Sequence, residues 1–338
     1  MAPDKQWPLV GRQGGAPSYG SSDFGEKQMQ LVSFVRPIGL ALALLFGMGL
    51  AGNVVEAADA LGPEKCQKCH KPEVSVWKGT KHAKSFKTTQ KSDKAKPILK
   101  AVDEKRMRKA ELCQTCHYTV IGGRAKEGPS CESCHGNASE WFEVHNNYGE
   151  GAKRETESAE HKAQRIKSAA DKGMIWPSMT YDVASNCMSC HGLGQDALSG
   201  DTIAKMIDAG HPINPEFELV RYSQGSVKHR FYPPNMDTNA DMTPAELSRT
   251  FIAGHAASIV AATAALKKSD HPKYVEAQNA RIAAAKAALD AIKGSVPEAG
   301  ALAGSPSEAN ARKLVAAIEG KDLSGAVGGM LPDKGTYK

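Results

Sequence analysis

Eight cysteines and four histidines of this 338-residue chain stand in a repeated pattern that can bind a redox cofactor. The cysteines form four pairs with two residues between the members of each pair, and a histidine follows each pair directly. The cysteines are Cys66, Cys69, Cys113, Cys116, Cys131, Cys134, Cys187 and Cys190, and the histidines are His70, His117, His135 and His191. Two thiols at this spacing reach both vinyl groups of one haem, and the next histidine then binds the iron. The pattern therefore predicts four covalently attached haem c groups.

Two other cysteine chemistries fit this pattern less well. The second and third pairs are separated by 14 residues, a spacing that also occurs in zinc sites made of four cysteines. Zinc does not require a histidine after each pair, and only 11 of the 338 residues are histidines. A two-residue spacing is typical of a redox motif rather than of a structural disulfide. Haem attachment is thus the favoured interpretation for all four pairs.

Seven histidines lie outside the motifs, and four haems need at most four of them as sixth iron ligands. His82 lies twelve residues after His70, so it cannot easily fold back onto that haem and is expected to bind a neighbouring one. His145 lies ten residues after His135. If that stretch is helical, Trp141 and His145 share a face, and the indole can pack against haem beside the ligand.

The other five histidines differ in their sequence surroundings. His211 and His229 lie in a Pro- and Gly-rich stretch with several aromatic residues, which suits the edge of a haem. His255 has small neighbours and is a weaker candidate, whereas His161 and His271 lie among charged residues and are expected to be solvated. For each candidate, the alternative is an ordinary surface or core histidine.

Two stretches around the motifs resemble the tetrahaem cytochrome c-554 family. The first is Trp77-Lys-Gly-Thr-Lys-His82 after the first motif, and the second is Cys131-Glu-Ser-Cys-His-Gly136 with His145 about ten residues further on. The resemblance covers roughly residues 64–195. The family includes the electron acceptor of hydroxylamine oxidoreductase in ammonia-oxidising bacteria, so the resemblance implies an electron carrier.

The resemblance also implies a set of iron ligands. Three haems of that family have two histidine ligands, and the second haem in sequence has an open sixth position. By position, the resemblance implies His145 for the haem of His70 and His82 for the haem of His135.

The ligands of the other two haems fall where the sequence departs from the family. The haem of His191 is implied to take a histidine from the region after its motif, where His211 and His229 both lie. The haem of His117 is implied to have no sixth ligand. The chain beyond residue 195 does not follow the family's pattern, and its extra histidines offer a way to fill that open position.

The first 57 residues are predicted to be a leader. An uncharged stretch from Pro37 to Val55 follows Arg36, and small residues surround a plausible cleavage point after Ala57. The alternative is an uncleaved membrane anchor, because this stretch is close to the lower length limit for spanning a bilayer. Both interpretations carry the rest of the chain across the membrane. The predicted location is therefore the periplasm or the outer cell surface.

Residues 58–235 are predicted to form the tetrahaem domain, and residues 236–338 a C-terminal Ala-rich helical region. The haem domain reads as short, irregular segments with brief helices, such as one over 93–112, and with no clear alternation for strands. The predicted fold class is mainly α with much irregular structure: a haem-packed multihaem cytochrome c core plus a C-terminal α-helical hairpin. The last residues, 328–338, are expected to fray.

Capping sequences predict three helices in the C-terminal region. A capping box at Thr243 with proline at the first helical position begins a helix that runs to about residue 268. A second helix is expected over 270–293, and a similar capping sequence at Ser305 begins a third that ends near residue 320. The first two are expected to form an antiparallel hairpin that covers the haem core, with partner docking as the alternative.

The sequence favours an electron carrier over other function classes. The net charge of +6 is offset by the two propionates of each haem, and no basic stripe with interleaved aromatics indicates a nucleic-acid partner. We therefore predict a non-enzymatic tetrahaem cytochrome whose partners are redox proteins or a quinol-oxidising membrane complex. The alternatives are a haem enzyme that reduces a small nitrogen or sulfur oxide at a five-coordinate haem, and a subunit of an extracellular cytochrome filament.

Overall fold

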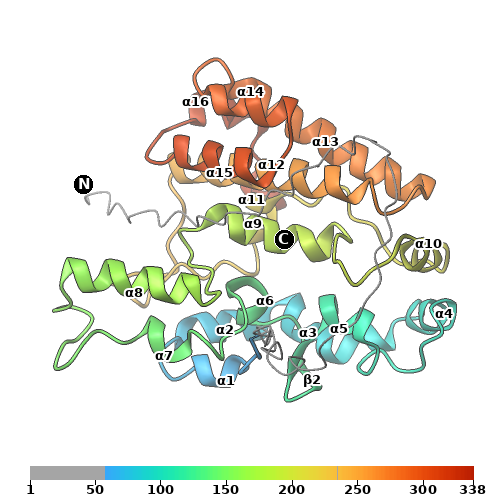
Figure 1. Ribbon diagram of the computed structural model, residues 1–338, viewed down its shortest axis with the longest axis horizontal. Coiled ribbons are helices and arrows are strands. Elements are labelled where there is room, and N and C mark those ends of the chain that lie inside the picture. The colour runs from blue at the N-terminus through green and yellow to red at the C-terminus, as the bar shows by residue number, and fades with distance from the viewer. Residues whose placement is uncertain (1–57, 234) are drawn as a thin grey trace, which may run out of the picture. The chain divides into compact units, whose positions relative to one another are not determined.

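The computed structural model describes residues 58–338 except residue 234, and the predicted leader lies outside these residues (Figure 1). The described chain consists mainly of helices joined by irregular segments, as predicted. The helices of the N-terminal half are α1 (Pro63–Cys66), α2 (Lys71–Gly79), α3 (Lys81–Thr88), η1 (Thr89–Lys91), α4 (Ala95–Ala101), α5 (Glu111–His117), α6 (Cys131–His135), α7 (Phe142–His145) and α8 (Ala159–Asp171). The later helices are α9 (Thr180–His191), α10 (Gly200–Asp208), α11 (Leu219–Ser223), α12 (Pro244–Ala265), α13 (Pro272–Ile292), α14 (Pro297–Gly304), α15 (Glu308–Ala317), α16 (Ser324–Val327), η2 (Gly328–Met330) and η3 (Lys334–Thr336).

The segment with the first three cysteine pairs has little apolar core of its own. Only five apolar residues between positions 65 and 136 are buried. They are Val74, Ala95, Ala110, Cys113 and Tyr118. So little buried apolar surface is unlike a self-supporting domain, because folding depends on apolar burial. This segment therefore needs another source of buried surface, which a large flat cofactor would supply.

A short β-hairpin follows the second motif and corrects the expectation of no strands. Strand β1 (Thr119–Ile121) pairs antiparallel with β2 (Arg124–Glu127). Gly122 and Gly123 connect them with φ angles of 56° and 72°, a left-handed conformation that glycine adopts at low cost. The strands are too short to show a recognisable alternation of apolar and polar residues. The Gly-Gly turn was the sequence feature that could have predicted this hairpin.

The predicted C-terminal hairpin is confirmed by α12 and α13, which pack along each other. The capping box at the start of α12 is also confirmed: the Glu246 N–H donates to Thr243 Oγ1 at 3.2 Å, and the Thr243 N–H donates to Glu246 Oε2 at 2.8 Å. In Figure 1, α12–α16 lie together on one side of α9, and α6 packs against the other side of α9.

Two predictions about helices were wrong, one between the first two motifs and one in the C-terminal region. The helix predicted over 93–112 is interrupted, because α4 and α5 are separated by a non-helical segment. The third C-terminal helix, α15, is capped by Ser307, whose hydroxyl accepts from the Asn310 N–H, and the shorter α14 precedes it.

The C-terminal tail is packed rather than frayed. The Lys338 N–H donates to Arg221 O at 2.9 Å, and Lys338 O accepts from the Ser226 N–H at 2.9 Å. Tyr337 packs against the main apolar cluster. These contacts attach the last residues to the chain around α11.

The largest apolar cluster joins α9 and α11 to the C-terminal helices. It includes Tyr181 and Met188 of α9, Val220 of α11 and Ile252 of α12, all 3% exposed or less. On α12, Gly254 allows a close approach, because a Cβ atom there would lie 2.7 Å from Leu219 Cβ. The C-terminal helices therefore cover the helix that carries the fourth motif. The predicted boundary between residues 235 and 236 stays a prediction.

No helix in the described part of the chain is both long and apolar enough to cross a bilayer.

Candidate haem-binding site

The structure places each motif histidine beside one histidine from another part of the chain. The ring centres are 6.4 Å apart for His70 and His145, 6.1 Å for His191 and His82, 6.1 Å for His117 and His211, and 6.2 Å for His135 and His229. Each of the four main candidates from the sequence therefore lies beside a different motif histidine.

This spacing fits a metal between the two rings. An imidazole–metal bond is about 2 Å long and the ring centre lies about 1 Å behind the bonded nitrogen, so two imidazoles on opposite sides of one metal have centres about 6 Å apart. Rings in direct stacking contact would lie closer than this. The residues present therefore fit one haem iron at each pair.

Nδ1 of four of these eight rings is hydrogen-bonded to a backbone carbonyl, and Nδ1 of His70 lies near a carboxylate. His135 Nδ1 lies 2.8 Å from Ile175 O, His145 Nδ1 2.5 Å from Phe142 O, His211 Nδ1 3.0 Å from Pro212 O, His229 Nδ1 2.5 Å from Val227 O, and His70 Nδ1 3.6 Å from Glu73 Oε1. A histidine ligand is usually fixed in this way through its second nitrogen, which leaves Nε2 free for a metal.

Burial lowers the pKa of six of the eight ligand candidates, whereas the neighbouring Glu73 carboxylate raises the pKa of His70; the six are His82, His117, His135, His145, His191 and His211. Burial lowers the pKa of His117 to about 4 and, with His82 and Arg281 as further causes, that of His191 to about 4. Because a metal binds the neutral imidazole, this shift removes competition from protons.

The cysteine pairs lie next to one another in an order that differs from their order in the sequence. Cys66 contacts Cys131, and Cys116 contacts Cys190. Helix α6 packs against both α1 and α9, and Asn186 Nδ2 donates to Ser133 O at 2.7 Å. The four motifs therefore form a row, with the sites of His70, His135, His191 and His117 in that order.

This row differs from a four-cysteine zinc site made by the second and third pairs. Cys116 has its thiol neighbour in the fourth pair and Cys131 has its neighbour in the first pair. Burial raises the pKa of Cys113 and Cys134 to about 11, whereas a zinc ligand is a thiolate.

Three histidines are not brought to a motif histidine. His255, the weaker candidate, contacts the Phe251 ring on its own helix, with ring centres 4.4 Å apart. His161 Nδ1 lies 2.7 Å from Glu157 Oε1, and His271 Nε2 lies 3.0 Å from Asp208 Oδ1.

Aromatic rings border three of the pairs, and Tyr118 beside His117 is the most distant of them, with ring centres 6.5 Å apart. Trp141 lies edge-on to His145 with ring centres 5.2 Å apart, so the predicted shared face is present. Phe217 stacks on His191 at 4.3 Å, and Tyr222 lies beside both. These two aromatics thus accompany the fourth motif rather than His211 or His229.

Glu132 is a site residue that the sequence reasoning missed. Its carboxylate is buried and accepts hydrogen bonds from the backbone N–H groups of Leu61, Gly62 and Ala138, at 2.8, 2.6 and 2.9 Å. It therefore joins the start of α1 to α6 and holds the first and third motifs together. An acidic residue between the cysteines of a motif was the only signal for this role.

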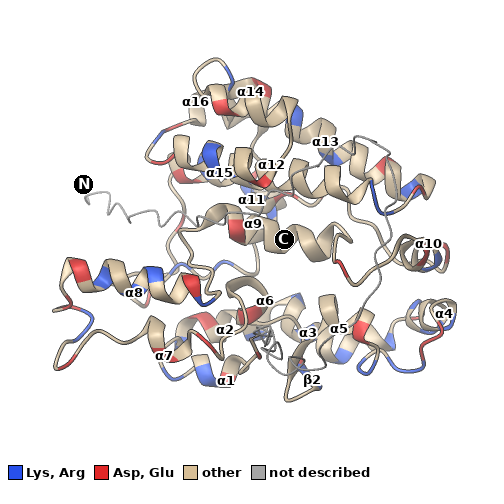
Figure 2. Cartoon of the chain, in the orientation of Figure 1, with Lys and Arg blue, Asp and Glu red and all other residues tan. Residues whose placement is uncertain are grey.

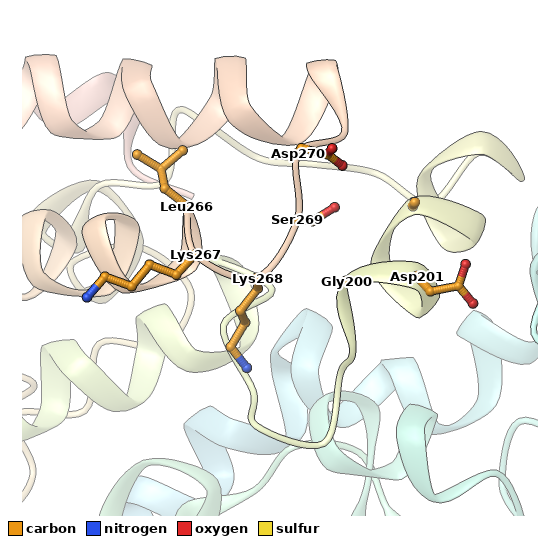
Figure 3. A pocket seen from close by; sticks show the side chains of 8 residues that line it. Gly200, Asp201, Leu266, Lys267, Lys268, Ser269 and Asp270 are labelled. Atoms are coloured by element: carbon orange, nitrogen blue, oxygen red, sulfur yellow. The ribbon is translucent and has the colours of Figure 1, made fainter.

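A hollow at the end of α12 is not part of this site. It has a volume of about 490 Å³ and is bordered by Asp201 at the start of α10 and by Lys268 and Asp270 after α12 (Figure 3). None of its lining residues is a cysteine or histidine.

Two comparisons with known proteins agree with the arrangement. A family model described as cytochrome c554 and c-prime matches residues 65–136, which contain the first three motifs. Cytochrome c-554 of Nitrosomonas europaea is 29% identical over 165 residues, which are 45% of this chain and 66% of the relative's length. The chain resembles the cytochrome c-554 family. No solved structure matches it.

The similarity to cytochrome c-554 supports a c-type cytochrome with covalently bound haem. Of the ligand pairs that the resemblance implied, His145 beside His70 is the arrangement that the structure has. Two other implied arrangements are absent from the structure. His82 is not brought to His135, and His191 lies beside His82 rather than beside a histidine from the region after its own motif.

The position of α3 explains this difference from the c-554-like expectation. Helix α3 packs against α5 and β2, where Gly128 approaches so closely that a Cβ atom would lie 2.0 Å from His82 O. Trp77 Nε1 also donates to Pro129 O at 2.9 Å. These contacts place His82 near the fourth motif and leave His229 to face His135.

The second motif also differs from the c-554-like expectation. The resemblance implied an open position at His117, but His211 lies beside it. The segment that carries His211 follows α10 and lies beyond the matched residues 65–136.

Proposed function

We propose that this chain is a tetrahaem c-type cytochrome that transfers electrons between redox partners outside the cytoplasm. The observation that carries the proposal is the presence of four histidine pairs with ring centres 6.1–6.4 Å apart, one at each Cys-x-x-Cys-His motif. The eight motif cysteines would hold the haems as thioethers.

Each site would be closed by two histidines of this chain. The pairs that would hold the irons are His70 with His145, His117 with His211, His135 with His229, and His191 with His82. When bound, haem supplies a reversible one-electron couple at each site. With two histidines bound to each haem, the charge of a site would change with little change in its geometry.

The row of motifs supports transfer over a distance. The sites of His70 and His117 are its two ends, and those of His135 and His191 lie between them. Adjacent cysteines in contact bring neighbouring sites close to one another. An arrangement with two separate ends suits a carrier that receives electrons at one surface and gives them up at another.

The contacts of the extra histidines favour a carrier over the two alternatives. A haem enzyme that reduces a nitrogen or sulfur oxide needs an open iron position, and His211 lies beside His117, where it would fill that position. A filament with shared ligands needs spare histidines, but His161, His255 and His271 contact other residues of the same chain.

The charge distribution supports an acidic redox partner. Residues 65–109 contain 15 Lys and Arg but only four Asp and Glu, and the Lys residues among them are exposed. Lys and Arg recur along α1–α4, whereas both signs occur on the C-terminal helices (Figure 2). Complementary charge accelerates encounter with an acidic protein. A quinol-oxidising membrane complex with an acidic face is an equally suitable donor.

Export is part of this proposal. Haem is attached outside the cytoplasm, where free thiols risk oxidation, and the predicted leader would carry the chain there. The leader lies outside the described residues.

The proposal is tested by the mass of the purified, exported protein. We expect the mass gain of four haems, and a Cys187→Ala/Cys190→Ala variant should carry three. A potentiometric titration of the intact protein should show reversible one-electron steps at every haem. A mass gain of fewer than four haems, or bound zinc in their place, would overturn the proposal.

A further inference from the structure

Three buried side chains of α13 donate hydrogen bonds to three successive carbonyls at the end of α9. The bonds run from Tyr274 Oη to Leu193 O at 3.1 Å, from Gln278 Nε2 to Gly192 O at 3.0 Å, and from Arg281 Nη2 to His191 O at 2.8 Å. The three donors are 0%, 1% and 3% exposed. Helix α13 thus holds the end of the helix that carries the fourth motif.

The positions of the three residues on α13 explain the hydrogen bonds, but they do not explain why one of the three donors, Arg281, is positively charged. Residues at positions i, i+4 and i+7 share one face of a helix, and the last carbonyls of a helix lack partners within it. The neutral groups of Tyr274 and Gln278 are sufficient for such capping. A third neutral donor in place of Arg281 would complete the set without burying a cation.

Arg281 is a buried cation whose acceptors in the described chain are all neutral. Nη1 donates to Gln278 Oε1 at 2.9 Å, and Nη2 donates to His191 O and to Asn214 O at 2.6 Å. Nε is buried without a hydrogen-bond partner, and burial lowers the pKa of this guanidinium. A buried charge is costly when no opposite charge offsets it, so the charge needs an explanation beyond capping.

The charge acts on the site of the fourth motif. Arg281 Nη2 is hydrogen-bonded to the backbone carbonyl of His191 itself, at 2.8 Å. Because Arg281 is buried, its interaction with this site is weakly screened. The positive charge of Arg281 therefore makes a further positive charge at the site of His191 less favourable.

We propose that Arg281 raises the reduction potential of the haem site formed by His191 and His82, so that α13 tunes one of the four sites. The inference rests on the proposed function. Reduction lowers the positive charge of a site by one unit, and a fixed neighbouring cation stabilises that reduced state. Arg281 acts through its charge and its hold on the His191 backbone, so it is a positioning residue and not a ligand. It lies outside residues 65–136, which the family model matches.

The test compares midpoint potentials of the intact, haem-loaded protein and its variants. Arg281→Gln removes the charge, and Gln278→Glu neutralises it in place with almost unchanged shape. Arg281→Lys keeps the charge, and Tyr274→Phe removes a neutral capping bond as the matched control. Potentials are measured by redox titration with absorbance and electron paramagnetic resonance, after the mass has established the number of haems.

We expect Arg281→Gln and Gln278→Glu to lower one of four potentials, by roughly a tenfold change in the reduced-to-oxidised ratio of that haem. Arg281→Lys and Tyr274→Phe should leave all four close to wild type. If Arg281→Gln does not fold, Gln278→Glu alone decides the question. Unchanged potentials in a protein with four haems would overturn the inference and leave the proposed function intact. A wild-type protein with fewer than four haems would instead overturn the proposed function.

Discussion

At the scale of single residues, sequence reasoning identified the groups but not how they pair. The Cys-x-x-Cys-His spacing defines a local chemistry, so the thioether cysteines and four motif histidines were recognisable without a fold. The surroundings of His145, His211 and His229 also marked them as candidates. Pairing depends on which distant segments pack together. For that reason, His82 could be associated with His135 by resemblance while α3 places it beside His191.

The pairing of His211 with His117 leads to a prediction for a single substitution. His211→Ala should leave one of four irons with an open position, because no other unpaired histidine contacts that site in the described chain. Electron paramagnetic resonance of the oxidised variant should then show about a quarter of its iron as high-spin, and the reduced variant should bind carbon monoxide.

His255→Gln provides the matched control for that experiment, since His255 is partly buried but contacts only Phe251 among the aromatic rings. It should stay low-spin and should not bind carbon monoxide. If His211→Ala behaves in the same way as this control, His211 is not an iron ligand.

At the scale of elements, helices that local sequence signals mark were predicted more accurately than elements that contacts between distant segments hold in place. The long Ala-rich helices α12 and α13 were predicted within a few residues, because capping sequences and proline mark their starts and alanine favours the helix. The elements around the first three motifs are short, and few of their apolar residues are buried. Their arrangement depends on contacts between distant segments, such as Glu132 with the start of α1, which no local pattern reveals.

The attachment of α7 to α8 leads to a prediction on pH. Arg165 Nη1 donates to His145 O at 2.6 Å, and its other nitrogens donate to both oxygens of Glu157 at 2.7 and 2.6 Å. Arg165 lowers the pKa of Glu157 to about 2, whereas an unfolded glutamate titrates at about 4.3. The pair therefore stabilises the fold fully above about pH 4.3, and this contribution is lost as the pH falls towards 2.

Glu157→Gln should reduce the free energy of unfolding by about 2 kcal/mol at pH 7, the size expected for hydrogen bonds between charged groups. The difference from wild type should shrink between pH 4.3 and 3. Thermal unfolding followed by circular dichroism measures both values, with the exposed Glu155→Gln as control. A difference that stays constant over this pH range would contradict the role of the ionised carboxylate.

At the scale of the whole molecule, two regions with different physical character are combined. The segment of 65–136 has a surplus of lysine and little apolar core, whereas α12–α16 have a dense apolar core and both signs of charge. Helix α9 belongs to both regions, since its last turn carries the fourth motif and its apolar face contacts α12. The proposed haems would complete the apolar core of residues 65–136. Helices α12–α16 would support the site of the fourth motif and tune its reduction potential.

Low-temperature electron paramagnetic resonance of the fully oxidised wild-type protein, with the haem number measured by mass, tests the central claim most directly. Because each motif histidine has a second histidine at the distance that one iron requires, we expect four haems that are all low-spin. A high-spin signal from about a quarter of the iron would contradict the account and return an open position to the site of His117.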